Sequence, residues 1–148
     1  MDMTKNWNGL IYIKWISLIL PTIYSVTPFI NGLGCDFQQQ YERDDISFYS
    51  TCKFGYVKTV GYNKISEKVI KYEGFIGKHG DTVIFIATKV DRQDVTKNPR
   101  HSNVYSVLND DALYIAKFIQ KDKDGWIVMT YPYYLIQKVK IVGTQSFW

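Results

Sequence analysis

The sequence predicts an all-β domain of six or seven short antiparallel strands that either close as an up-and-down barrel or stack as a sandwich. Two observations predict this fold. From residue 52 onward, short runs of alternating apolar and polar residues are separated by Gly, Asn and Asp, which favour turns. Aromatic residues make up 16% of the chain, which is enough to fill a core or to line an apolar pocket.

The N-terminal segment differs from the rest of the chain. Residues 10–26 are nearly all apolar and follow a short segment with one lysine, as in a secretory signal peptide. Glycines stand three and one residues before Cys35, which fits cleavage of residues 1–34. Because Lys14 interrupts the run, an uncleaved signal anchor is the rival interpretation, although the run is slightly shorter than the about 20 apolar residues of a membrane span. We expect a secreted domain of residues 35–148 with no membrane span after cleavage.

The expected strands follow a polar lead-in from Asp36 to Asp45. They occupy residues 52–63, 67–77, 82–90, 104–108, 113–121 and 126–132. Tight turns are expected at Gly80-Asp81, at residues 109–111 and at residues 121–125, because their Gly, Asn and Asp residues favour turn conformations. The tail after residue 132 has both β-branched residues and a helical spacing of apolar residues, and we favour a last strand.

The two cysteines and the charge distribution narrow the functional class. In an oxidising compartment Cys35 and Cys52 would close a loop worth about 3 kcal/mol, and the alternative is that each thiol stays free. The formal charge of +4 comes from scattered basic residues, whereas a nucleic-acid partner usually requires a clustered basic face. We therefore expect no nucleic-acid partner.

Residues with catalytic or metal-binding chemistry do not converge in the sequence. His79 and His101 lie in a turn and a loop, and the Asp pairs at 44–45 and 110–111 lie in a polar lead-in and a turn. Cys, His, Asp and Glu do not cluster at the spacing of metal ligands. We expect neither an enzyme nor a protein that requires a cofactor or a metal.

The stretch NVYSVLNDDALYI, residues 103–115, resembles the second conserved region of the lipocalins, especially the insect bilin-binding and apolipoprotein D-like members. In that family a strand ending in Val-Leu meets Thr-Asp-x-x-x-Tyr. Here Asn109 replaces the Thr, and Asp110 and Tyr114 match the Asp and the Tyr at the same spacing. Downstream, Trp126 takes the place of a tryptophan that follows a polar turn in the family.

The chain departs from the family pattern at both ends of the barrel. The Gly-x-Trp motif that opens the family's first strand is missing here. Only sixteen residues separate Cys35 from Cys52, where related chains insert a whole strand. Near the other end of the chain, Thr130 replaces the arginine that closes the barrel in the family. Gln120 or a neighbour replaces the usual cysteine partner, so Cys35 either pairs with Cys52 or one thiol is exposed. The resemblance implies a lipocalin-like barrel open by one strand. Its unpaired edge would be covered by residues 37–48 or paired in a homodimer.

The resemblance implies an extracellular carrier of a small hydrophobic molecule, such as a bilin, retinoid, fatty acid or pheromone-like compound. The alternative is a secreted interaction module or inhibitor on a degenerate scaffold without a cavity. Inward positions carried over from the family are Phe85, Asn103, Tyr105, Val107, Ile115, Lys117, Ile119, Trp126 and Val128. An inward Lys117 would meet a ligand carboxylate, whereas a register shifted by one residue would turn it to water. For Tyr105 and Trp126, plain core packing is the competing interpretation.

Overall fold

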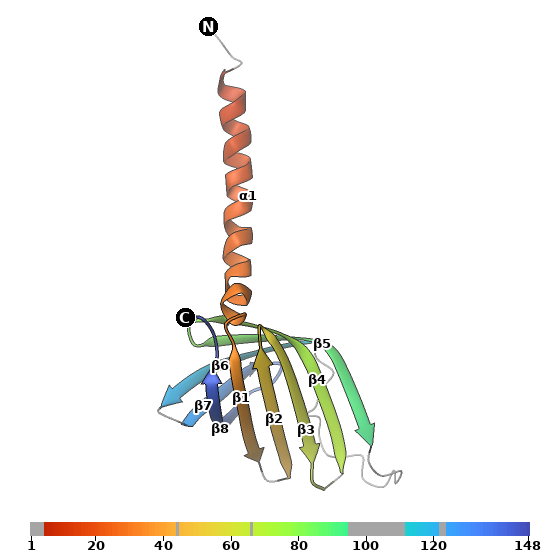
Figure 1. Ribbon diagram of the computed structural model, residues 1–148. Coiled ribbons are helices and arrows are strands. Elements are labelled where there is room, and N and C mark those ends of the chain that lie inside the picture. Colours follow the sequence, from red (N-terminus) through yellow and green to blue (C-terminus); the bar gives the residue numbers. More distant parts are fainter. Residues whose placement is uncertain (1–4, 44, 66, 95–111, 122–123) are drawn as a thin grey trace.

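The computed structural model describes residues 5–43, 45–65, 67–94, 112–121 and 124–148, and within these ranges the side chains of all residues except 5–13, 93–94, 120–121 and 124. A long helix, α1 (Lys5–Gly32), leads into eight antiparallel strands that form a closed barrel in sequence order (Figure 1). The strands are β1 (Asp36–Arg43), β2 (Ile46–Lys53), β3 (Tyr56–Asn63), β4 (Lys68–His79), β5 (Thr82–Asp94), β6 (Leu113–Lys121), β7 (Asp124–Tyr131) and β8 (Leu135–Thr144). The predicted all-β, up-and-down barrel is confirmed, and the sandwich is excluded.

The expectation that the barrel lacks its first strand is wrong. The segment predicted as a polar lead-in forms β1, which pairs with β2 on one side and with β8 on the other, as in Phe37↔Cys52 and Phe37↔Gly143. Its inward residues are Phe37, Gln39 and Tyr41. Because Gln39 is polar, the sequence of β1 lacks the regular alternation of apolar and polar residues that indicates a strand. Because β1 pairs on both sides, the unpaired edge expected from a missing first strand is not found among the described strands, and the homodimer itself stays a prediction.

The local turns agree with the sequence at most positions. Gly80 has a φ of 56° and lies in the turn from β4 to β5, as predicted, and the tail forms β8 rather than a helix. The expected single strand over residues 52–63 is wrong, because it contains a two-residue hairpin turn at Phe54 and Gly55. Their φ values of 50° and 77° are both positive, as a type I′ turn requires, but phenylalanine is not a residue that signals such a turn.

The predicted strand at residues 104–108 lies outside the described residues. Within the described part of the chain, β6 pairs with β5 on one side, from Thr82↔Lys117 to Ile86↔Leu113. On its other side β6 pairs with β7. β5 thus lies beside residues 113–117 of β6.

The disulfide between Cys35 and Cys52 is formed, which confirms the predicted pairing. The two Cα atoms lie 5.7 Å apart, and both side chains are 2% exposed. The bridge belongs to a buried cluster with Phe37, Val57 and Ile76 at the end of the barrel from which α1 emerges. This end of the barrel is therefore closed by packed side chains.

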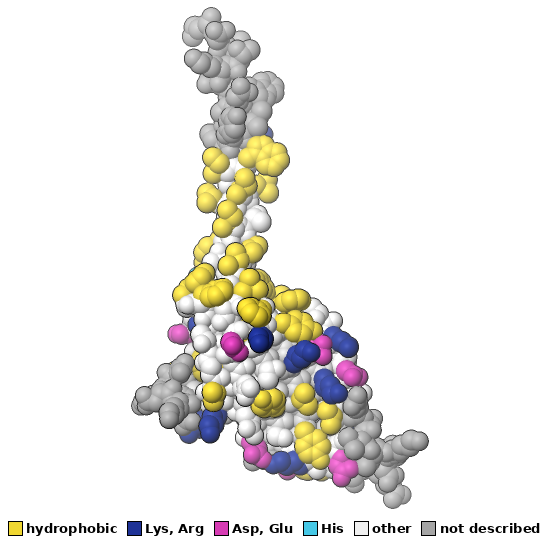
Figure 2. Space-filling view, in the orientation of Figure 1, with side chains coloured by type: hydrophobic (Ala, Val, Ile, Leu, Met, Phe, Trp, Pro, Cys, Tyr) yellow, Lys and Arg dark blue, Asp and Glu magenta, His cyan; other side chains and the backbone are white. Residues whose placement is uncertain are grey.

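Most of α1 projects away from the barrel, and only its C-terminal part contacts the barrel, mainly at β4 (Figure 1). Hydrophobic side chains cover the projecting part in the view of Figure 2. Among the residues with described side chains, no helix has the length and hydropathy required to cross a membrane.

Candidate ligand cavity

The barrel surrounds a partly open cavity of about 170 Å³, to which all eight strands contribute. Successive side chains of a strand point to opposite faces, so every second residue lines the interior. The lining residues are Phe37, Gln39, Tyr41, Phe48, Ser50, Val57, Thr59, Tyr72, Ile76, Val83, Phe85, Tyr114, Ala116, Ile127, Met129, Tyr133, Leu135 and Gln137. An eight-stranded barrel is just wide enough to hold one small ligand, and this interior fits that expectation.

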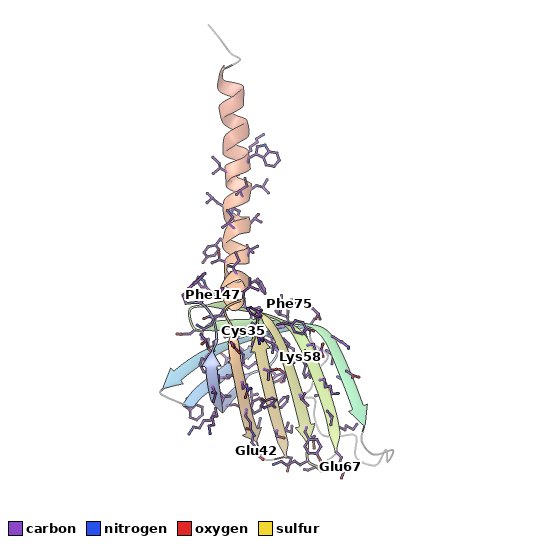
Figure 3. The ribbon with its side chains drawn as sticks, in the orientation of Figure 1. Cys35, Glu42, Lys58, Glu67, Phe75 and Phe147 are labelled. Atoms are coloured by element: carbon purple, nitrogen blue, oxygen red, sulfur yellow. A yellow bond between two sulfur atoms is a disulfide. The ribbon has the colours of Figure 1, made fainter. Side chains whose placement is uncertain are left out.

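The cavity is apolar toward the helix. Figure 3 shows Cys35 and Phe147 at the helix end of the barrel and Glu42 at the opposite end, so β1 runs from one end to the other. Phe37 therefore lies near the helix end, and Val57 and Ile76 pack in the same buried cluster. A ligand that reaches this part of the cavity would contact carbon atoms almost exclusively.

Polar groups lie farther along the cavity. The hydroxyls of Ser50 and Thr59 are hydrogen-bonded to each other at 2.9 Å across β2 and β3. Gln39 and Gln137 add amide groups from β1 and β8, and Gln137 is buried. These neutral donors and acceptors would orient a ligand that has a polar group of its own.

Four tyrosines, here called the tyrosine cluster, complete the polar part of the lining: Tyr41, Tyr72, Tyr114 and Tyr133. The rings of Tyr72 and Tyr114 meet edge to face at 5.8 Å, and Tyr72 is 5% exposed. Burial raises the pKa of Tyr41 far above its usual range, and the neighbouring Tyr133 raises this pKa further. Burial also raises the pKa of Tyr72, with a further contribution from Tyr114. These phenols therefore stay neutral at physiological pH.

Charged side chains are absent from the described part of the cavity wall. None of the described lining residues is Lys, Arg, His, Asp or Glu. A carboxylate or an ammonium group that lies among these uncharged residues would lose its hydration, which is costly. The positive charges that act on the wall come from outside the lining: against the larger effect of burial, Arg43 lowers the pKa of Tyr41, and Arg92 lowers that of Tyr72. The chemistry of the wall therefore favours a neutral ligand.

Phe85 is the one predicted site residue that the structure places in the cavity wall. The residues expected to face inward on β6 and β7, Ile115, Lys117, Ile119, Trp126 and Val128, alternate with the lining residues and point to the outer face, which corrects the prediction. Ile119 and Trp126 are cross-strand neighbours there and are 53% and 45% exposed. Asn103, Tyr105 and Val107 lie outside the described residues.

A register error of one residue explains this correction. The inward residues of β6 are Tyr114 and Ala116, and those of β7 are Ile127 and Met129, each adjacent to a position that was predicted. A shift of one residue moves a whole strand to the other face of a sheet. Both faces of these strands are apolar, because Ile119 and Trp126 are exposed, so the sequence pattern alone does not distinguish inside from outside.

Most of the cavity wall was missed by reasoning from the sequence. Its residues on β1, β2 and β8 include Gln39, Ser50 and Gln137, and polar residues of this kind are expected to face water. The available signal was the alternation of Phe37, Gln39 and Tyr41, which places the glutamine on the same face as two aromatic rings.

The described residues hold no group of three or more His, Cys, Asp or Glu side chains that could bind a metal ion. Comparisons with known protein families, with curated proteins and with solved structures found no match to this chain. The resemblance to the lipocalins therefore stays a prediction, and a function has to be argued from the cavity itself.

Proposed function

We propose that the barrel binds a small, neutral and mostly apolar molecule in its interior. The observation that supports this is the cavity of about 170 Å³, with an apolar wall, a few hydroxyl and amide groups and no charged residue among its described lining. An apolar protein cavity of about 150 Å³ takes up benzene, so a chamber of this size suits a ligand of similar or slightly larger bulk. Burial of the ligand would contribute roughly 25 cal/mol per Å² of apolar surface before the costs of association.

The cavity favours some of the predicted ligand classes over others. Drug-sized ligands occupy about 300–1,000 Å³, so a bilin or a retinoid would require the barrel to open further. A fatty acid would need a cationic partner for its carboxylate, and Lys117, the residue predicted for that role, is exposed on the outer face. A pheromone-like alcohol, ketone or ester is the class that fits both the volume and the neutral wall.

The ligand would enter from the end of the barrel opposite α1. The helix end is closed by the cluster around the Cys35–Cys52 disulfide. Tyr133, between β7 and β8, and Tyr41, near the end of β1, lie at the other end. Their neutral phenols would meet the polar group of a ligand whose apolar part points toward the helix.

Displacement of an environment-sensitive naphthylamine fluorophore tests the proposal. No tryptophan is among the described lining residues, so an added fluorophore reports on the cavity better than Trp126 does. Straight-chain alcohols of increasing length should displace the fluorophore up to a size limit, and the matching carboxylates should bind at least tenfold more weakly at neutral pH because their charge is desolvated.

A pair of adjacent substitutions locates the binding. Ala116→Phe fills the cavity and should abolish displacement, whereas Lys117→Phe adds the same side chain on the outer face and should leave affinity unchanged. Since overpacking can destabilise a core, Met129→Ala provides a second variant, which should enlarge the cavity and shift the size limit to longer alcohols. A folded protein that binds no member of the series, or equal effects of the two phenylalanine variants, would contradict the proposal and favour an interaction module.

A further inference from the structure

We propose that α1 is retained in the folded protein and that its projecting part inserts into a lipid bilayer, which holds the barrel at a membrane surface. Three independent observations carry this inference. The C-terminal end of α1 is built into the barrel, the serine and threonine hydroxyls of the projecting part are hydrogen-bonded within the helix, and exposed aromatic residues surround the point where the helix leaves the barrel.

Asn31 fixes the end of α1 to the barrel. Its side chain is 1% exposed, and its Nδ2 donates hydrogen bonds to the backbone oxygens of Lys78 and Trp148, both at 2.9 Å. The backbone N–H of Trp148 donates to Asn31 Oδ1 at 3.0 Å, and that of Phe147 donates to the Asn31 carbonyl at 3.2 Å. This one residue therefore joins α1, the end of β4 and the segment after β8, and cleavage before Cys35 would remove it.

The two glycines that resemble a cleavage site have a packing role instead. A Cβ atom on Gly32 would lie 2.1 Å from the carbonyl oxygen of Ile76, and one on Gly34 would lie 2.4 Å from the backbone nitrogen of Phe147. No other residue type allows the chain to pass this close to the barrel. Their small size is explained by the folded structure, so it is no longer evidence for cleavage after residue 34.

The projecting part of α1 has an apolar surface over most of its circumference. No residue from Trp15 to Ile30 is charged. Its exposed large apolar side chains are Trp15, Ile16, Leu18, Ile19, Leu20, Ile23, Tyr24, Val26 and Ile30, each 46% exposed or more. A helix that is hydrophobic on nearly all sides is normally buried in a protein or in a membrane, because exposing so much apolar surface to water is energetically unfavourable.

The serine and threonine hydroxyls of this segment are hydrogen-bonded within the helix. Each of its four serine and threonine hydroxyls donates a hydrogen bond to a carbonyl three or four residues earlier: Ser17 to Lys14, Thr22 to Leu18, Ser25 to Pro21 and Thr27 to Ile23, at 2.7–2.9 Å. In water such bonds gain little, but in lipid an unsatisfied hydroxyl costs several kcal/mol. Pro21 and Pro28 lie inside the helix, and membrane helices contain proline more often than soluble ones.

An aromatic collar, consisting of Tyr24, Phe54, Phe147 and Trp148, surrounds the base of the helix. These side chains are 64–75% exposed, and the rings of Phe147 and Trp148 stack at 6.0 Å. Phe54 belongs to this end because its backbone N–H donates to the carbonyl of Cys35. Figure 2 shows hydrophobic side chains gathered at the junction of helix and barrel. Tyr and Trp are enriched where membrane proteins cross the lipid–water interface, so the collar fits a bilayer surface.

Flotation with vesicles tests the insertion. The full chain, purified in a mild detergent, is mixed with phosphatidylcholine vesicles, the detergent is removed, and the mixture is spun in a density gradient. The chain should float with the vesicles and resist extraction by alkaline carbonate. The double variant Ile19→Glu/Ile23→Glu should float at least tenfold less, because carboxylates are poorly tolerated in lipid.

A control variant places the same two charges on exposed apolar residues of the barrel. Tyr49→Glu/Ile136→Glu should float like the unmodified chain, because these side chains lie on the outer face of β2 and β8. Equal loss of flotation in both double variants would overturn the proposal, as would a full chain that stays at the bottom of the gradient as a self-associated oligomer.

The intact mass of the chain made in a secreting host tests retention of the helix. A membrane-bound product whose mass includes residues 14–34 is expected. A soluble product that begins at Cys35, or at any residue within α1, would overturn the proposal. Neither outcome depends on ligand binding, so the membrane and the cavity proposals can fail separately.

Discussion

Replacing Asn31 with alanine should destabilise the barrel by about 3 kcal/mol. The substitution removes three hydrogen bonds of a buried side chain, to the backbone of Lys78 and twice to that of Trp148, and each contributes about 1 kcal/mol net. Asn31→Asp should cost at least as much. It keeps the acceptor for the Trp148 N–H but sets a carboxylate against two backbone oxygens that had received hydrogen bonds.

Urea unfolding of the full chain in nonionic detergent, followed by circular dichroism, measures the loss. Gln38→Ala is the control, because Gln38 is an exposed amide on β1 and its removal should change the free energy of unfolding by less than about 0.5 kcal/mol. A loss below about 1 kcal/mol for Asn31→Ala would refute the reasoning, since the junction of α1 with the barrel would then be a marginal contact rather than part of the fold.

Three further outcomes are expected. Burial raises the pKa of Tyr41 in the folded state, so above pH about 10 the unfolded state loses this proton first and the free energy of unfolding falls as pH rises. Urea titrations at several pH values should show a shallower fall for Tyr41→Phe, by up to about 1.4 kcal/mol per pH unit. Parallel pH profiles for the two proteins would contradict this prediction. The double substitution Cys35→Ser/Cys52→Ser should lower the free energy of unfolding by about 3 kcal/mol, and a reductant should not lower it further in that variant. Lys117→Ala should change the affinity for a neutral ligand by less than twofold relative to the unmodified chain, as measured by fluorophore displacement. A tenfold loss of affinity would indicate that Lys117 contacts the ligand.

The two proposals fit one arrangement of the molecule. If α1 lies in a bilayer and the aromatic collar at its surface, the closed end of the barrel faces the membrane. The end with Tyr41 and Tyr133 then faces the aqueous side, where a ligand would enter. A protein of this kind would hold a small apolar molecule next to a membrane rather than carry it freely through solution.

The sequence correctly predicts the elements whose chemistry is local. Gly80-Asp81 predicts its turn because glycine adopts positive φ without strain, and the β-branched run at residues 82–90 predicts a strand, which forms as part of β5. The expectation that this strand is buried is wrong, because Ala87 is its only buried residue between Thr82 and Val90. Phe54 illustrates the limit of this reasoning. The pairing of β2 with β3 holds a residue with no turn preference at positive φ.

Two segments of the chain depend on contacts that are remote in the sequence. β1 looks like a polar lead-in until β8, about a hundred residues later, pairs with it and turns Gln39 into the barrel. The glycines near Cys35 fit a cleavage site in the sequence, and in the folded chain they pack closely against Ile76 and Phe147. In both cases a segment with weak local preference takes its structure from its partner.

The sequence by itself therefore determined the all-β class and the apolar character of the N-terminal segment, because these follow from alternation and from composition. It offered the Cys35–Cys52 disulfide as one of two alternatives, and the structure decided for it. Only the tertiary structure decided that the barrel is closed, which face of β6 and β7 lines the cavity, and that Asn31 belongs to the folded unit. The physical reason is that alternation gives the period of a strand but not its phase, and the phase is set by strands that pair across the barrel.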